Sequence, residues 1–238
     1  MAPVMNKPEP NADALLANSS PRQRATRGRP TRKRLSHEER RREIMHVAKQ
    51  IIHRKGSEAA SLQEIADALN MKKASLYYYF SSKEELLQDI LTTIIGEGMT
   101  RVRGILERQQ DDPLTRLWRL VASHIHHLCA DVVDVAVFLH ERKMIPPDKR
   151  KTLLADDYAY EAAFIDTIRA GQRAGQIRDD IDAKLVALSL LGSTNWTYTW
   201  YKSDGDLTPA FIGSQFATMT INSLANEATL RSWQPPPA

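Results

Sequence analysis

The sequence lacks the features on which exported and membrane proteins depend. Among its 238 residues only Cys129 is a cysteine, so no disulfide can form within the chain and no cysteine-rich zinc site can be built. No segment approaches the roughly 20 consecutive apolar residues that span a bilayer, and the first thirty residues contain no apolar core of a signal peptide. These absences predict a cytoplasmic protein that is neither exported nor embedded in a membrane.

Motifs for catalysis are also missing. The sequence contains no nucleophile motif, no phosphate-binding glycine loop and no paired-carboxylate signature, which argues against an enzyme. Histidines surround Cys129 at His124, His126, His127 and His140, and two of them, three residues apart, share a helix face. No carboxylate stands at a matching spacing within that turn. We therefore expect no metal site and no cofactor.

Acidic residues are absent from the segment between Pro21 and Leu35, which contains seven arginines and lysines. The whole chain has a net charge of only +4, so the positive charge is concentrated locally. A cationic block of this kind is typical of a solvated arm or of a contact with a polyanion. Together with the lack of apolar periodicity, it predicts that residues 1–35 are a disordered basic arm that contacts nucleic acid.

Within this arm, Arg27-Gly28-Arg29-Pro30 has the form of the core of an AT-hook. Arginine is attracted by the narrow minor groove of A·T-rich DNA, glycine lets the backbone approach the groove floor, and proline keeps the chain extended. Arg27 and Arg29 are therefore candidate DNA contacts. The alternative is a generic basic tail that adds salt-sensitive affinity without sequence preference.

No segment alternates convincingly between apolar and polar residues, so we predict an all-α fold. Ser36 with Glu39 predicts a capped helix that stops at Gly56. Ser61 begins a second helix, which ends at Asn70, a residue that tolerates the left-handed conformation of a sharp turn. A third helix follows, from Lys72 or Lys73 to Phe80, and Ser82 caps a long fourth helix. This pattern predicts a helix-turn-helix DNA-binding domain over residues 36–91.

The third helix contains three consecutive tyrosines, and their angular positions explain them. Leu76 and Phe80 share the packed face, so Tyr77 and Tyr78 point outward while Tyr79 lies at the edge of that face. About eight residues form a rod of roughly 12 Å, which matches the width of the major groove. The alternative is an amphipathic helix whose aromatic side chains cover a neighbouring domain.

The stretch SLQEIADALNMKKASLYYYFSSKEEL, within a match that runs from Ser36 to about Leu91, resembles the DNA-binding domain of the TetR family of bacterial transcription regulators. The resemblance implies phosphate contacts from the second helix, the end of the third and the start of the fourth, and base contacts from the start and middle of the third. Lys72 departs from the family, which commonly has a serine or similar cap there. The implied DNA-binding residues are Ser61, Lys72, Lys73, Ala74, Ser75, Tyr77, Tyr78, Tyr79 and Lys83.

Residues 92–228 are predicted to form a helical domain for ligand binding and dimerisation, followed by a disordered tail over 229–238. The segment LVALSLLGSTNWTYTWY is apolar on two faces, so a helix there needs two partners. In the TetR family the last two long helices pair with their symmetry mates, which implies a homodimer that binds a palindromic operator in double-stranded DNA. The implied interface residues are Leu188, Gly192, Phe216 and Met219.

Aromatic residues scattered through this domain are candidates to enclose a ligand, although such residues also fill ordinary cores. The run from Asn195 to Tyr201 resembles that of TetR-family regulators of fatty-acid and steroid breakdown, whose effectors are acyl-CoA thioesters. A CoA ligand also needs cations for its phosphates, and a solvated basic face is the alternative role of such cations. The candidate ligand-binding residues are Phe138, Tyr160, Phe164, Arg169, Trp196 and Trp200.

These observations favour a dimeric repressor that a small apolar ligand, such as an acyl-CoA, releases from its operator. An effector-independent architectural DNA binder is the alternative, and it predicts binding that ignores operator sequence. An all-helical enzyme is a third class, for which the sequence offers no reactive constellation.

Overall fold

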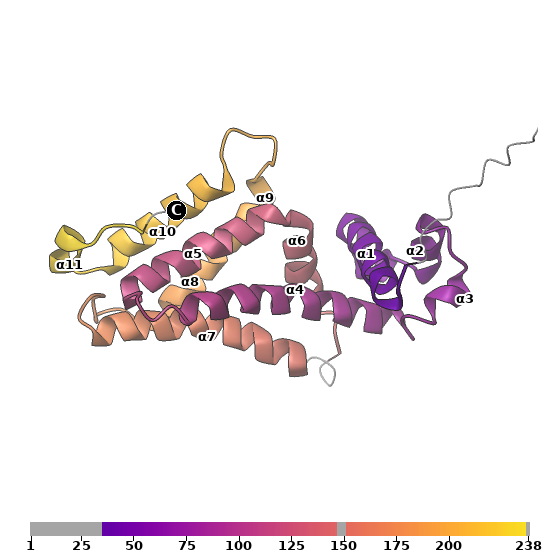
Figure 1. The fold of residues 1–238 in the computed structure, drawn as a ribbon, viewed down its shortest axis with the longest axis horizontal. Coiled ribbons are helices and arrows are strands. Elements are labelled where there is room, and N and C mark those ends of the chain that lie inside the picture. The colour runs from indigo at the N-terminus through magenta and orange to yellow at the C-terminus, as the bar shows by residue number, and fades with distance from the viewer. Residues whose placement is uncertain (1–34, 147–150, 237–238) are drawn as a thin grey trace, which may run out of the picture. The chain divides into compact units, whose positions relative to one another are not determined.

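The computed structural model describes residues 35–146 and 151–236, and every regular element within them is a helix (Figure 1). This confirms the predicted all-α class. A single isolated bridge joins Ile177 to Ala225 in this part of the chain. The predicted contacts Arg27 and Arg29 lie outside the described residues.

The first helices form a three-helix unit, which we call the head, around the start of a long fourth helix. Ser36 and Glu39 form a reciprocal capping box before the first helix, and Gly56, with φ of 80°, interrupts its regular geometry where the sequence predicts a stop. Asn70 has φ of 51°, as the predicted turn requires. The elements are α1 (His37–Ala59), α2 (Leu62–Ala68), α3 (Lys73–Leu76) and α4 (Lys83–Leu106).

The regular part of α3 is shorter than the predicted eight residues. It ends at Leu76, and the chain continues through a turn in which the amides of Tyr79 and Phe80 donate to the Leu76 carbonyl over 2.9 and 3.1 Å. The side chain of Lys72 makes no capping hydrogen bond at the start of α3. Phe80 is fully buried, and Ser82 is extended where it caps α4. The α-helical geometry therefore gives way to a tighter turn between Leu76 and Phe80.

The remaining helices form the body, which packs against the second half of α4. Asp112 and Thr208 each cap a helix whose first residue is a proline, and Asp182 caps the helix that starts at Ala183. The elements are α5 (Pro113–Ala130), α6 (Val132–Glu141), α7 (Lys151–Arg173), α8 (Ala183–Asn195), α9 (Thr197–Trp200), α10 (Pro209–Leu224) and α11 (Glu227–Ser232).

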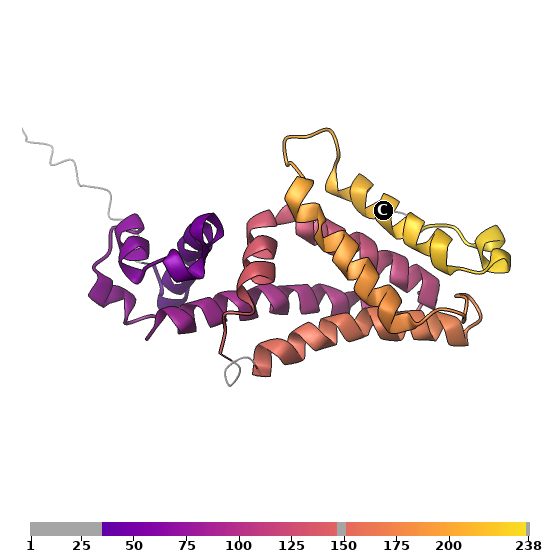
Figure 2. The same ribbon diagram turned by 180° about the vertical axis from the view of Figure 1, so that it is seen from behind.

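Helix α7 packs against α4, α5 and α8, while α10 lies along α5 (Figures 1 and 2). Helix α10 approaches α5 closely at Gly213, where an added methyl group would stand 2.9 Å from the carbonyl oxygen of Ala122. Glycine therefore sets the spacing between these two helices.

Two predicted boundaries differ from the structure. Helix α4 runs without a break through the predicted limit between residues 91 and 92, and thus belongs to both head and body. The predicted tail from residue 229 includes the last residues of α11, which extends to Ser232. Asn226 caps this helix, and the indole of Trp233 donates to Thr115 Oγ1 over 3.2 Å while its ring packs on the core.

In residues 35–146 and 151–236 we find no single helix that combines the length and apolarity of a membrane span. Helices α5 and α6 reach that composition only when they are taken together, and they bend by 98° where they meet.

Candidate DNA-reading head and ligand cavity

The surface of the head around α3 carries the side chains that the sequence assigns to DNA. Lys72, Lys73, Ala74 and Ser75 are exposed at its start. Leu76 is fully buried against the core of the head. This leaves one face of α3 free to contact a duplex.

The three tyrosines divide as their helical positions predict. Tyr78 is 75% exposed and Tyr77 is 48% exposed, whereas Tyr79 is half-buried at the edge of the core. The ring of His37, the first residue of α1, stacks on Tyr79 at 4.9 Å and meets Tyr78 edge-on at 5.5 Å. His37 therefore supports the exposed tyrosine from a distant helix, and no local sequence signal indicates this contact.

Arg41 of α1 braces the end of the reading segment. Its guanidinium donates to the carbonyl of Tyr79 over 2.5 Å, lies 4.1 Å from the centre of the Phe80 ring and pairs with Asp89 of α4. One side chain thus joins α1, the turn after α3 and α4. Sequence reasoning missed this residue because its partners are far away along the chain.

Lys83, the predicted phosphate contact at the start of α4, makes hydrogen bonds within the head. Its ammonium donates to the carbonyls of Ser57, Glu58 and Ala60 at 2.9, 3.2 and 3.2 Å. An ammonium has three donors, so these bonds use all of them. In the structure, Lys83 therefore satisfies backbone carbonyls at the end of α1. Ser61, by contrast, is exposed at the start of α2, where its Oγ accepts from the Glu64 amide over 3.1 Å.

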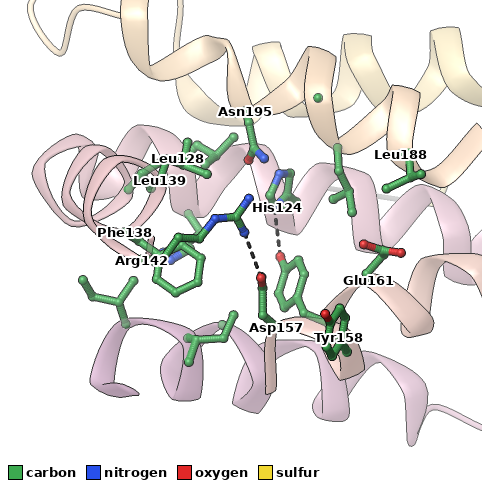
Figure 3. A pocket seen from close by; sticks show the side chains of 18 of the residues that line it. His124, Leu128, Phe138, Leu139, Arg142, Asp157, Tyr158, Glu161, Leu188 and Asn195 are labelled. Atoms are coloured by element: carbon green, nitrogen blue, oxygen red, sulfur yellow. Dashed lines mark hydrogen bonds and ion pairs between the residues drawn. The ribbon is translucent and has the colours of Figure 1, made fainter. Parts of the chain in front are cut away.

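The body contains a cavity of about 490 Å³, lined by side chains of α4, α5, α6, α7 and α8 (Figure 3). Its walls are mostly apolar and include Ile94, Leu128, Val135, Phe138 and Leu139. A cavity of this size, with a few polar groups on apolar walls, suits a small organic molecule.

Exposed and charged side chains line one part of the cavity. Tyr158 is 63% exposed, and Lys143 is also exposed. Arg142 Nη1 lies 2.8 Å from Asp157 Oδ2, and its guanidinium lies over the Phe138 ring at 5.7 Å. Burial raises the pKa of the Asp157 carboxyl, although Arg142 opposes this shift.

Buried polar groups line another part. His124 Nδ1 lies 2.8 Å from the hydroxyl oxygen of Tyr160, and Asn195 lies beside the imidazole (Figure 3). Burial lowers the pKa of His124 to about 4, so its imidazole is neutral at pH 7. Burial also raises the pKa of the Tyr160 phenol. The Tyr160 ring fits closely over Gly98 of α4, where an added methyl group would stand 3.2 Å from it.

The structure brings only two of the six sequence-predicted ligand residues to this cavity, namely Phe138 and Tyr160. Phe164 is fully buried and packs against Tyr160 and His124 from outside the lining. Arg169 pairs with Asp166 elsewhere on α7. The indoles of Trp196 and Trp200 are 64% and 41% exposed and do not contribute to the wall.

The predicted dimer residues also separate. Leu188 and Gly192 lie on the cavity wall, although both are exposed in the single chain. Phe216 and Met219 line a different groove, which lies between α8 and α10 and is also lined by Leu185 of α8. Residues of α8 therefore line both the ligand cavity and this groove.

Helix α6 connects the cavity to the head. Phe138 lines the cavity and also belongs to the hydrophobic core that contains α1. At the end of α6, buried Glu141 accepts from the amide of Ser57 over 3.1 Å and from its hydroxyl over 2.5 Å. Lys49 of α1 pairs with the buried Asp134 of α6 over 2.5 Å. A shift of α6 would therefore be felt directly by α1.

Among the residues that the structure describes, no three His, Cys, Asp or Glu side chains converge on a point where a metal ion could bind. His124 and His127 both line the cavity, and Cys129 is buried, which raises the pKa of its thiol to about 11. Within this cluster, His124 lies within hydrogen-bonding distance of Tyr160 and His127 within hydrogen-bonding distance of Arg101.

The three-helix head and the helical body with its internal cavity define a helix-turn-helix DNA-binding protein. Two family models match the chain. The model described as "Bacterial regulatory proteins, tetR family" matches residues 44–90, and "Tetracyclin repressor-like, C-terminal domain" matches residues 110–224. The chain belongs to the TetR family, and it is a DNA-binding transcriptional regulator and not an enzyme.

Similar proteins support this assignment. The HTH-type transcriptional repressor KstR2 of Rhodococcus jostii (strain RHA1) is 28% identical over 189 residues, which are 79% of this chain and 92% of that protein. A TetR-family regulator from Bordetella parapertussis 12822 is 30% identical with a TM-score of 0.70 over 77% of this chain and 94% of that chain. The structure of AibR with isovaleryl coenzyme A and operator DNA is 28% identical with a TM-score of 0.69 and covers 79% and 98% of the two chains.

Proposed function

We propose that this protein is a dimeric repressor, and that an acyl-CoA thioester binding in the body cavity releases it from its operator. The observation that carries the proposal is the position of α6. Its Phe138 lines the cavity, while its Glu141 and Asp134 hold α1 of the head. A ligand that moves α6 therefore changes the placement of the head.

The lining of the cavity supports an acyl-CoA as the ligand. The apolar walls suit an acyl chain, and Arg142 and Lys143 supply positive charge for phosphates at the exposed part. A phosphate would compete with Asp157 for Arg142, and the loss of that ion pair would reduce the binding free energy gained from the phosphate. The solved structure of AibR with isovaleryl coenzyme A shows that a similar fold holds this class of ligand.

In the head, we propose that α3 lies in the major groove. Tyr77 and Tyr78, with the exposed residues Lys73 to Ser75, face base edges, and Lys72 and Tyr79 contact the backbone at the flanks. Ser61 at the start of α2 is placed for a phosphate contact. The prediction for Arg27 and Arg29 of the basic arm stands unchanged.

Dimerisation places two heads on the two halves of an operator. The groove between α8 and α10 exposes Leu185, which is 67% accessible, and Met219, which is 64% accessible. We propose that this groove, including Phe216, pairs with the same surface of a second copy. Met219→Glu places a charge in the groove, and sedimentation should then show a monomer. A control substitution on the exposed face of α7, Asp166→Asn, should leave the dimer intact.

Release from DNA follows if the ligand binds one conformer better than the other, and the shift is limited by that difference in affinity. Typical coupling free energies of about 1–3 kcal/mol correspond to changes of roughly 5–150-fold in operator affinity. The measurement is fluorescence anisotropy of an operator duplex, found by mapping the genomic binding sites, during titration with acyl-CoAs of increasing length.

Two arginines give a matched pair for this titration. Arg142 lines the cavity, whereas Arg169 is exposed and paired with Asp166 elsewhere on α7. Arg142→Ala should raise the acyl-CoA concentration that releases DNA about tenfold, while Arg169→Ala should leave it unchanged. CoA alone and the free fatty acid serve as controls. If no acyl-CoA lowers operator affinity, the induction mechanism is wrong and the effector-independent binder becomes the better interpretation.

A further inference from the structure

The buried polar part of the cavity contains a hydrogen-bonding atom without a partner. His124 is only 7% exposed, and its Nε2 is buried without a hydrogen bond. The side chain of Asn195 lies beside the imidazole and favours its charged form as a hydrogen-bonding neighbour, but its geometry falls outside that of a hydrogen bond to Nε2. A buried polar atom without a partner costs free energy, so such an atom on a cavity wall points to a ligand group that satisfies it.

The hydrogen bond on the other side of the ring determines what Nε2 can offer. His124 Nδ1 lies 2.8 Å from the hydroxyl oxygen of Tyr160, and a neutral imidazole has one donor and one acceptor nitrogen. If Tyr160 donates its only proton to Nδ1, that proton is satisfied and Nε2 carries the hydrogen of the ring. The opposite arrangement would deprive the Tyr160 proton of the Nδ1 acceptor at this partly buried position. The arrangement that satisfies more groups therefore makes Nε2–H a donor.

His127, one turn further along α5, repeats the arrangement. Arg101 Nη2 lies 2.8 Å from His127 Nδ1, and because a guanidinium can only donate, Nδ1 must accept. His127 also lines the cavity. Burial lowers its pKa to about 4, so this imidazole is also neutral and keeps its hydrogen on Nε2. In both neutral histidines, therefore, Nδ1 faces the protein partner and the Nε2–H donor lies on the other side of the ring.

We propose that His124 Nε2–H donates a hydrogen bond to a carbonyl oxygen in the buried part of the ligand, so that the cavity selects carbonyl compounds over hydrocarbons of the same shape. Tyr160 acts as a positioning residue that fixes the tautomer. The inference rests on the proposed function for the location of the ligand. Within an acyl-CoA the oxygen belongs either to the thioester or to a ketone further along the chain.

The first test needs no CoA and no DNA. Acetophenone and α-methylstyrene have nearly the same shape, but only the first has a carbonyl oxygen. Their dissociation constants for the free dimer are measured by nuclear magnetic resonance with ¹⁵N-labelled histidine. The ratio of the two constants should favour acetophenone about tenfold more in the wild-type protein than in His124→Leu, because the variant lacks the donor. An unchanged ratio overturns the inference. Failure of both compounds to bind the wild-type protein overturns it as well.

Further variants separate a recognition role from a structural one. His124→Gln retains an N–H donor and should restore part of the preference for acetophenone. Tyr160→Phe should reduce the preference, since the tautomer is no longer fixed. His126 is exposed on the same helix outside the cavity, so His126→Leu should leave the ratio unchanged. In the wild-type spectrum His124 should be the neutral Nε2–H tautomer, and a neutral Nδ1–H tautomer would falsify the assignment.

The second test locates the oxygen within CoA ligands. Binding of S-decyl-CoA, decanoyl-CoA and decanoyl-CoAs with one ketone is compared in the wild-type protein and in His124→Leu. If the thioester oxygen is the acceptor, decanoyl-CoA should bind about tenfold better than S-decyl-CoA only in the wild type. If a chain ketone is the acceptor, one ketone position should show that gain. Equal losses for all these ligands in His124→Leu contradict the inference, whereas binding without operator release contradicts only the proposed function.

Discussion

In the head, the side chains offered to DNA lie in a short exposed stretch, from Lys72 to Tyr79, on one helix and the turn after it. In the body, five helices that span residues 83–195 each contribute to one cavity, whose buried polar group is His124. A reading surface made of consecutive residues can be recognised from sequence spacing. A cavity depends on how distant helices pack, so its lining follows from the tertiary structure.

The largest expected effect is on operator affinity, which substitutions in the head should reduce and a matched substitution in the body should not. The double substitution Tyr77→Ala and Tyr78→Ala should weaken operator binding by about 4 kcal/mol, roughly a thousandfold, because each base contact is worth about 2 kcal/mol. Binding to a scrambled duplex should change much less. Anisotropy with both duplexes measures this, and Tyr158→Ala, which removes an exposed tyrosine of the body, is the control. Retention of full affinity and selectivity by the double variant would remove α3 from the interface.

Acid should destabilise the body through His124. The pKa of His124 is lowered to about 4 in the folded protein, whereas an unfolded histidine titrates near 6.5. The unfolded chain then binds more protons, so stability falls as the pH drops from about 6.5 to 4, on the order of 3 kcal/mol for this group. Urea unfolding at pH 7 and at pH 4.5 measures the loss. His124→Leu should show a flatter pH dependence, and an identical slope in both proteins would contradict the assignment.

Lys83 tests where the reading surface ends. Lys83→Ala should lower the free energy of unfolding by about 2 kcal/mol, because three carbonyls lose a charged donor. The salt dependence of operator binding should stay the same. Lys72→Ala should show the reverse, with unchanged stability and a salt slope reduced by about one. If Lys83→Ala instead reduces the slope and leaves stability intact, the phosphate contact implied by the family resemblance is right.

The smallest effect concerns the spacing of α5 and α10. Gly213→Ala places a methyl group 2.9 Å from the Ala122 carbonyl and should destabilise the protein by about 1 kcal/mol after the gain in helix propensity is counted. Gly104 of α4 has no atom within 4 Å of an added methyl group, so Gly104→Ala should stabilise by up to about 1 kcal/mol. Thermal unfolding compares the two variants. Equal shifts would mean that the glycine does not set this contact.

Most of the fold could be predicted because its signals are local. The Ser36 capping box, the left-handed Asn70 and the Thr208–Pro209 helix start each depend on a few neighbouring residues. Contacts between residues far apart in the sequence could not be predicted, because these local signals do not report them. The Lys83 ammonium points back to carbonyls at the end of α1, and no spacing rule distinguishes this from a phosphate contact.

The cavity lining shows the limit more sharply. Phe138 and Phe164 are both aromatic residues on apolar helix faces, yet only Phe138 lines the cavity and Phe164 packs behind it. Their difference depends on the rotation of α6 and α7 relative to their neighbours. Hydrophobic periodicity gives the buried face of a helix but not which part of that face meets a void. His124 carried the strongest chemical feature of the cavity and looked, in the sequence, like one of several ordinary histidines.

The close fit of Tyr160 over Gly98 affects both the size of the cavity and the position of the hydroxyl beside His124. Any side chain larger than hydrogen at position 98 forces the phenol ring to tilt, and the hydroxyl that orients His124 moves with it. A relative with alanine there would therefore differ from this protein both in how bulky a molecule it admits and in which functional group it prefers.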